Sequence, residues 1–511
     1  MIFNSFVFLL FFPLVAIGYF FLTICIGRNN IKVANTLSQF LLLAASLIFY
    51  GYWNIAYLVL ILTSIIVTWT SGLLMQGRST GIKRLVLTGS LVINLGILFF
   101  FKYYGFFTES VLFFFRGNVQ FPSLNVLLPV GISFYTFQAL GYSIDVYYGK
   151  VQAEYNFITY ALFVTFFPQL VAGPIERTGN LLPQFKVNHA FDYDQVSSGL
   201  RLALWGMFKK VVIADSLAVY VDVIFGTPGI YPAGSLALAT FFFAFQIYCD
   251  FSGYSDIAIG CARVLGFRLM TNFKQPYFSR SISEFWRRWH ISLSTWFKDY
   301  LYIPLGGNRK GKIRQNVNLI VIFLVSGLWH GAAWNFVVWG GLHGMYQIIG
   351  RNTASVRTAI AHSIGLGKES WLKKIMQLCI TFVLVYFSWI FFRANSMEDA
   401  FLIIGKLVKL PSELVLNIFQ IGLKETVKEA ILVGYGVENA ISGFDRNNLI
   451  VSVFLILILL ISDGLSIKIP DLQAKIVQMP LVLRWAGYYS MFFAIAASWN
   501  TESPMFIYFT F

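Results

Sequence analysis

Five histidines are the side chains of this chain best suited to move a proton near neutral pH: His189, His290, His330, His343 and His362. An imidazole has an ordinary pKa of about 6.5, so it can take a proton from a hydroxyl and return it within one reaction. His330 lies in the most apolar surroundings, within Ser326-Gly-Leu-Trp-His-Gly-Ala-Ala-Trp-Asn335. Because burying an ionisable group is costly, His330 is a candidate functional residue. The alternative is a neutral histidine that is hydrogen-bonded to a neighbouring helix.

A second histidine could assist His330. His343 follows thirteen residues later, and on one straight helix the two would lie on nearly opposite faces, about 20 Å apart. They would not pair unless the helix broke at Gly340-Gly341. His290 is the better candidate partner and would have to reach His330 through the tertiary fold. For His290 the alternative is a histidine at the membrane surface.

Glycine pairs flank His330 and His343. Gly327 and Gly331 bracket His330, and Gly340 and Gly344 bracket His343. This spacing lets two helix backbones approach closely. It predicts that His330 projects into a narrow, packed interior.

The composition places these residues in a membrane protein. Of 511 residues, 57% are apolar, 18% are aromatic and 12% are charged, whereas a soluble domain carries roughly twice that charged fraction. Ordinary soluble enzymes, disordered proteins and nucleic-acid modules are therefore excluded. At about 20 residues per span, the apolar content predicts roughly 10–13 transmembrane helices. The net charge of +15 fits Lys and Arg retained on the cytoplasmic side.

The elements that position the histidines are expected to be helices only. Several apolar stretches are short or broken by Gly and Pro, and irregular backbone at membrane depth must be covered by protein or line a cavity. We therefore expect an all-α polytopic membrane protein with re-entrant or interfacial helices around a central cavity. Residues 1–449 would form the core, and 450–511 would hold a C-terminal pair of transmembrane helices. The chain lacks the internal repeat that is typical of many transporters.

Residues 273–314 form a basic layer with nine basic and two acidic side chains. Trp and Tyr alternate with Lys and Arg there, as at a membrane–water interface, so we expect this layer to face the cytoplasm. The segment from Gly306 to Ile313 is close to a P-loop pattern, but Ile313 replaces the hydroxyl that would hold Mg²⁺ and no strand precedes it. A nucleotide hydrolase is excluded. The loop is either a basic surface turn or a site for an anionic cytoplasmic ligand.

Acidic and sulfur-containing residues give weaker signals. Asp250 and Asp256 lie in an apolar neighbourhood, and an ion pair with Arg287, Arg288 or Arg393 is the simplest expectation. The four cysteines are far apart, without a C-x-x-C or Cys/His cluster. We therefore expect no metal site and no disulfide framework.

The ordered motifs resemble the membrane-bound O-acyltransferase family, and within it the alginate O-acetyltransferase branch. The similar segments are 286–296, 299–308, Ser326–Gly331, Trp339–Gly344, Gly131–Tyr135, Ala172–Pro174, Asp250–Asp256 and Phe506–Phe511. The resemblance covers most of the chain. It implies that this family's helical membrane fold is present.

The resemblance also implies an activity and a site. The family moves an acyl group from a thioester to a hydroxyl, and His330 occupies the position of its essential membrane-embedded histidine. His290 occupies a second polar catalytic position. We expect His330 to be the general base and His290 to orient substrate or stabilise developing charge, although the two roles could be exchanged. The residues expected to bind substrate or donor are Trp286, Arg287, Arg288, Trp296, Asp299, Asn308, Trp329 and Asn335.

In this branch the donor would be a cytoplasmic thioester, either acetyl-CoA or an acyl carrier, with no bound cofactor. The acceptor would be an exported, alginate-like polysaccharide. The partners would be extracytoplasmic acetyltransferase subunits and the polysaccharide synthesis and export machinery, with the chain in the bacterial cytoplasmic membrane. Peptidoglycan O-acetylation and teichoic-acid D-alanyl transfer are alternative reactions. A proton-coupled transporter or flippase is the alternative of a different class.

Overall fold

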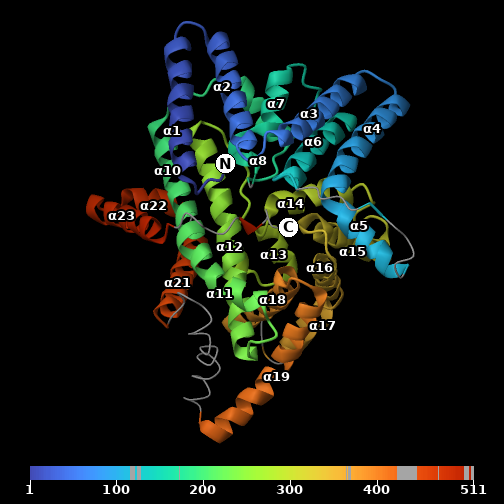
Figure 1. Ribbon diagram of the computed structural model, residues 1–511, viewed down its shortest axis with the longest axis vertical. Helices are drawn as coiled ribbons and strands as arrows, with labels where there is room; N and C mark the ends of the chain where they lie inside the picture. Colours follow the sequence, from blue (N-terminus) through green and yellow to red (C-terminus); the bar gives the residue numbers. More distant parts are fainter. Residues whose placement is uncertain are drawn as a thin grey trace. The chain divides into compact units, whose positions relative to one another are not determined.

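All regular elements in the described part of the chain are helices (Figure 1). The computed structural model describes residues 1–115, 121–122, 128–171, 173–363, 365, 370–422, 446–469, 471–499 and 506–507. Within these ranges, seven helical segments are long and apolar enough to cross a membrane: Phe6–Ile26, Ile31–Gly51, Ala56–Met75, Thr80–Phe114, Ala233–Val264, Trp371–Arg393 and Asn447–Lys468. The expected all-α polytopic membrane fold is confirmed.

Contacts divide the chain into two compact units, each built from separate segments. Unit 1 comprises Met1–Met207, Tyr254–Asn272 and Thr295–Tyr300, and unit 2 comprises Phe208–Gly253, Phe273–Ser294 and the described residues of Leu301–Phe511. Ala172 and residues 508–511, which belong to two of the motifs above, lie outside the described residues.

Unit 1 contains most of the amino-terminal helices. They are α1 Phe6–Phe21, η1 Leu22–Ile26, α2 Ile31–Gly51, α3 Ala56–Met75, α4 Thr80–Leu98, η2 Phe99–Tyr103, α5 Tyr104–Phe114, α6 Ile132–Tyr147, α7 Phe157–Thr165, α8 Phe167–Leu170, α9 Thr178–Leu181, η3 Leu182–Lys186 and α10 Tyr193–Met207. Short polar side chains start several of them. The Asn156 side chain, for example, accepts hydrogen bonds from the first amides of α7, which satisfies donors that have no partner within the helix.

Unit 2 contains the predicted histidine site. Its elements are η4 Phe208–Ala214, α11 Asp215–Gly226, η5 Pro276–Phe278, α13 Ile282–Arg288, α15 Gly311–His330, α16 Trp334–Asn352, α17 Ala354–Ser363, α18 Trp371–Arg393, α19 Met397–Ile421, α21 Arg446–Lys468, α22 Leu472–Gln478 and α23 Leu481–Ser498. Three further elements contain residues of both units: α12 Ala233–Val264, α14 Ile291–Phe297 and η6 Lys298–Tyr302.

The apolar stretch around His330 is two helices rather than one. His330 is the last residue of α15, and Gly331 is extended, with φ −160° and ψ 146°. The chain then re-enters helix at Trp334, which begins α16. The helix therefore breaks between His330 and Trp334, earlier than the break at Gly340-Gly341 that the sequence analysis considered. The separation computed for one straight helix therefore does not apply to His330 and His343.

Close packing of α15 on α16 depends on two glycines, one from each predicted pair. A Cβ on Gly327 would overlap the carbonyl oxygen of Phe336, and a Cβ on Gly340 would overlap that of Phe323. The Cα atom of each of these glycines lies within 3.4 Å of the other's ideal Cβ position. The expected backbone approach is confirmed, and it fixes where the carboxyl end of α15 holds His330.

Candidate functional site

The structure brings His290 and His330 together in the interior of unit 2. Their ring centroids are 6.3 Å apart, and the two residues are 0% and 2% exposed. They come from different elements, His330 from the end of α15 and His290 from the junction between α13 and α14. The tertiary fold therefore supplies the proximity that the sequence argument required.

The hydrogen bond of His330 selects one tautomer of its ring. Its Nδ1 lies 2.6 Å from the carbonyl oxygen of Ser326, one turn earlier in α15. A carbonyl only accepts, so Nδ1 carries the proton. In the neutral ring, Nε2 then holds the lone pair. His330 is thus prepared to accept a proton at Nε2 and to keep a fixed ring orientation while it does so.

His290 has a backbone conformation that few non-glycine residues adopt. Its φ is +43°, a left-handed conformation that costs an L-residue roughly 1–2 kcal/mol. This turn ends α13 after Arg288 and lets α14 start at Ile291, with the Ser294 amide donating to the His290 carbonyl. Strained residues of this kind cluster at functional sites. Here the conformation turns the His290 side chain into the same aromatic interior as His330.

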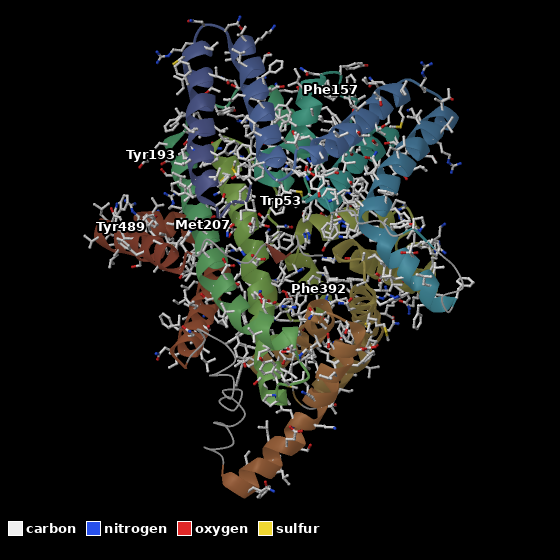
Figure 2. All side chains as sticks on the ribbon, viewed as in Figure 1. Trp53, Phe157, Tyr193, Met207, Phe392 and Tyr489 are labelled. Carbon is white, nitrogen blue, oxygen red and sulfur yellow. The ribbon has the colours of Figure 1, made fainter. Side chains whose placement is uncertain are left out.

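Aromatic rings surround both imidazoles. Trp339, Trp329 and Phe392 lie 4.7, 5.0 and 5.7 Å from His330 between ring centroids. Phe251 and Trp329 lie 4.6 and 5.7 Å from His290. Phe392, labelled in Figure 2, belongs to α18. Such walls exclude bulk water and fix the orientation of the rings. Burial lowers the pKa of His290 well below its usual range, and the nearby His330 lowers it further.

The residues of unit 2 that were predicted to bind substrate or donor fall into two groups. Trp329 contacts both imidazoles, and Trp286 contacts Trp339, which in turn touches His330. Asn335 is buried and donates to the Ala394 carbonyl at 2.8 Å. By contrast, the other three are at least partly exposed: Arg287, Arg288, whose guanidinium pairs with Glu284 at 2.7 Å, and Asn308.

The two remaining predicted residues, Trp296 and Asp299, lie in unit 1. Trp296 stacks on Phe137 at 4.0 Å and donates to the Phe137 carbonyl at 2.9 Å. Asp299 pairs with Arg177 at 2.9 Å, and the Arg177 guanidinium lies over the Tyr300 ring. Both residues therefore have firm structural partners within unit 1.

The ion-pair partner expected for Asp250 is wrong. Asp250 pairs with Lys210 of η4 at 2.8 Å, and Lys210 also binds Asp215 at 2.7 Å. A second oxygen of Asp250 accepts from the Ile507 amide at 2.8 Å. Of the arginines proposed as partners, Arg393 pairs with Asp222 instead. The sequence analysis did not predict Lys210 as the partner, because the apolar residues around it resemble an ordinary membrane span.

The arrangement is suited to proton transfer. Among the described residues, no three His, Cys, Asp or Glu side chains are grouped as metal ligands. What is grouped is an imidazole with a defined lone pair, a second imidazole beside it and a wall of aromatic rings. A general base positioned in this way assists attack by a hydroxyl.

Two further polar residues lie close to this site: His343, which the spacing argument set aside as a partner of His330, and Ser388, which sequence reasoning missed. Both are 0% exposed, and the Ser388 hydroxyl lies 2.9 Å from His343 Nε2. The spacing of Trp339 and His343, one helical turn apart, could have indicated that they share a face. Ser388 has no such signal, because it is 45 residues away in the chain.

Comparison with known proteins shows which family the chain resembles. The model of MBOAT, the membrane-bound O-acyltransferase family, matches residues 150–392, which include His290, His330, His343 and Ser388. A protein of Pseudomonas syringae pv. tomato named probable alginate O-acetylase AlgI is 40% identical over 405 residues, which are 78% of this chain and 74% of that protein.

Relatives with other acceptors in their names are also similar. A peptidoglycan O-acetyltransferase of Helicobacter pylori is 37% identical over 443 residues, 80% of each chain. A teichoic acid D-alanyltransferase of Streptococcus thermophilus is 29% identical over 52% of this chain and 68% of that protein. All three names describe acyl transfer, which a transporter or flippase does not perform. The chain belongs to the membrane-bound O-acyltransferase family and is a multi-pass membrane acyltransferase.

Proposed function

We propose that this protein moves an acetyl group from a cytoplasmic thioester to hydroxyl groups of an exported polysaccharide, with His330 as the general base. The observation that carries the proposal is the hydrogen bond from His330 Nδ1 to the Ser326 carbonyl, which puts the proton of the neutral ring on Nδ1 and its basic lone pair on Nε2. The names of the similar proteins from Pseudomonas syringae pv. tomato and Helicobacter pylori support O-acetyl transfer to a polymer.

The reaction needs one proton to be moved and returned. As the acceptor hydroxyl attacks the thioester carbonyl carbon, its proton passes to His330 Nε2. The tetrahedral intermediate then expels the thiolate, which takes the proton from His330, so that the products are an ester and a thiol. General-base assistance of this kind contributes roughly 10²–10⁴-fold in rate.

His290 is placed to assist without acting as the base. Its ring stays neutral because burial lowers its pKa, and it lies 6.3 Å from His330 between centroids. A neutral imidazole can donate one hydrogen bond to the acceptor or to the oxyanion of the intermediate. We assign His290 this orienting or charge-stabilising role.

The basic turn near Asn308 is our candidate for attracting the donor. Asn308, Arg309 and Lys310 are exposed, and the turn depends on Gly306 and Gly307, both with positive φ. The phosphates of acetyl-CoA, or the surface of an acidic acyl carrier, are complementary to this charge. We expect the turn to face the cytoplasm, because cytoplasmic loops of membrane proteins carry an excess of Lys and Arg.

The acceptor and partners are proposed from the relatives. An exported, alginate-like polysaccharide would receive the acetyl group outside the bacterial cytoplasmic membrane, with extracytoplasmic acetyltransferase subunits and the export machinery as partners. Peptidoglycan is the second candidate acceptor, because the relative with that name matches 80% of this chain.

The test compares base-labile acetate in secreted polymer and in cell wall. Cells would produce the wild-type protein, His330→Ala or His362→Ala at matched abundance; His362 is an exposed histidine on α17 and serves as the control. Loss from the secreted polymer in His330→Ala alone supports the proposal. Loss from the wall moves the acceptor to peptidoglycan, and unchanged acetate in both fractions overturns O-acetylation and leaves D-alanyl transfer.

A further inference from the structure

His343 lies in a directional chain of hydrogen bonds that admits only one form of its ring. Its Nδ1 is 3.2 Å from Trp286 Nε1, and an indole N–H can only donate, so Nδ1 must be unprotonated. At the other side of the ring, Nε2 lies 2.9 Å from the Ser388 hydroxyl. That hydroxyl donates its single proton to the Val385 carbonyl at 2.7 Å. The Ser388 oxygen therefore accepts, and His343 Nε2 carries the proton.

The chain runs from Trp286 through His343 and Ser388 to the Val385 carbonyl. All members are well buried: Trp286 is 7% exposed, His343 and Ser388 are 0% exposed, and Val385 is 1% exposed. A protonated His343 would set two N–H groups against each other at Trp286. The network therefore holds a neutral His343 in one tautomer and one orientation.

This network connects α13, α16 and α18. Each of these helices continues into, or packs beside, the residues around His290 and His330. Trp286 lies on α13, which ends directly before Trp289 and His290. On α16, Trp339 lies one turn before His343 and contacts both His343 at 5.1 Å and His330 at 4.7 Å. On α18, Ser388 is followed by Trp389, which stacks on Trp339 at 5.9 Å and contacts Trp289 at 5.2 Å.

We infer that His343 is a positioning residue for acyl transfer: it locks α13, α16 and α18 together and thereby fixes the aromatic walls against His330 and the turn at His290. His343 touches no reacting atom in this account. The inference rests on the proposed role of His330. A displacement of about 1 Å at a reacting centre can cost roughly 10²-fold in rate, so the lock has a measurable consequence.

The test measures kcat and KM for acetyl-CoA in ester formation by the full-length protein in lipid vesicles. His343→Phe keeps a ring of similar shape but loses both hydrogen bonds. We expect kcat to fall roughly 10- to 100-fold, with KM within about two-fold of the wild type. His343→Gln keeps one acceptor and one donor and should recover kcat to within about three-fold of the wild type.

Two further variants keep the test informative if His343→Phe does not fold. Ser388→Ala removes only the acceptor of His343 Nε2 and should lower kcat about three- to ten-fold. Tyr386→Phe is the control, because Tyr386 lies on the same helix and the substitution removes a partly buried hydrogen bond to the Ala237 carbonyl. It should keep the wild-type kcat.

The outcomes separate this inference from the proposed function. Wild-type kcat in both His343→Phe and Ser388→Ala would overturn it, as would a loss in His343→Gln equal to that in His343→Phe. His330→Ala is measured in the same vesicles. If that variant is fully active, the proposed function fails; if it is inactive while the His343 and Ser388 variants are normal, only the inference fails.

Discussion

Two buried clusters in unit 2 hold titratable side chains in opposite ways. In the ionic cluster, the Lys210 ammonium is neutralised by Asp215 and Asp250 at 2.7 and 2.8 Å. In the histidine cluster, His330 donates to the Ser326 carbonyl, and aromatic rings such as that of Trp339 pack around its imidazole. A group whose charge is already paired contributes to structure. A neutral imidazole with a defined lone pair can still change its protonation state, so the difference separates a structural role from a chemical one.

The clusters are adjacent, which makes the comparison experimentally useful. Asp250 belongs to the ionic cluster, and the next residue, Phe251, packs its ring 4.6 Å from His290. A substitution in one cluster is therefore close enough to affect the other. Because the roles differ, we nevertheless expect that stability and catalysis can be disturbed separately.

The largest expected change in stability comes from breaking the ionic cluster. Lys210→Met leaves Asp215 and Asp250 buried without their cation, which costs about 3–5 kcal/mol. Thermal unfolding in detergent should show a large drop in the midpoint. Adding Asp250→Asn removes one of the uncompensated charges, so the double variant should unfold at a higher temperature than Lys210→Met. Equal midpoints for wild type and Lys210→Met would contradict the structural role.

The next largest effect separates catalysis from stability at His290. Asparagine tolerates positive φ better than most residues, so His290→Asn should keep the turn while removing the imidazole. The transfer rate should fall roughly 10²-fold, the usual cost of one oxyanion donor, while the unfolding midpoint changes little. Ester formation and thermal unfolding are measured on the same preparation. A wild-type transfer rate in His290→Asn would show that His290 takes no part in catalysis.

Packing between α15 and α16 is the third way to disturb the histidine cluster. Gly340→Ala places a Cβ against the Phe323 carbonyl oxygen and should cost about 1–3 kcal/mol through overpacking. Because α15 carries His330, activity should fall as well. Gly341→Ala is the control, since its Cβ would meet only Leu324 at an ordinary 3.6 Å. If the two alanine variants behave alike, close helix approach does not position His330.

The smallest expected effect is on the pH dependence of stability, through the buried carboxyl of Glu176 in unit 1. Asp250 pairs with a lysine, whereas Glu176 accepts hydrogen bonds from neutral donors. Glu176 accepts from the Met270 amide and from Asn180, and burial raises its pKa to about 7. The folded protein therefore binds one more proton than the unfolded chain between about pH 4.5 and 7. Stability should fall as pH rises through that window, by at most about 1.4 kcal/mol per pH unit, and then level off.

Replacing the carboxyl isolates this effect. Glu176→Gln cannot titrate, so its unfolding midpoint should lose the decline that the wild type shows between about pH 4.5 and 7. Midpoints measured from pH 4.5 to 8 for both proteins give the answer. Identical pH profiles would mean that Glu176 titrates at the same pH in the folded and unfolded chains.

Properties that depend on composition or short spacing could be predicted from the sequence. The apolar content gave the all-α membrane fold, and the glycine pairs around His330 and His343 predicted the close approach of α15 and α16. The approach of His290 to His330 was also expected, because helical spacing argued against His343 and made His290 the better candidate partner.

Features that depend on long-range contacts or on strained backbone could not be predicted. The turn at His290 follows from a positive φ that tertiary packing imposes, and local propensity carries no trace of it. The break after His330 required Gly331 to be extended, which the apolar pattern conceals. Lys210 and Ser388 meet Asp250 and His343 only in the folded chain, so the sequence predicts neither contact.

The most direct test of the account measures thiol release from acetyl-CoA by purified protein in lipid vesicles, with and without a hydroxyl acceptor. We expect acceptor-dependent release by the wild type and a rate roughly 10²–10⁴-fold lower in His330→Ala, with little change in the unfolding midpoint. Release at the wild-type rate by folded His330→Ala would show that His330 is not the base.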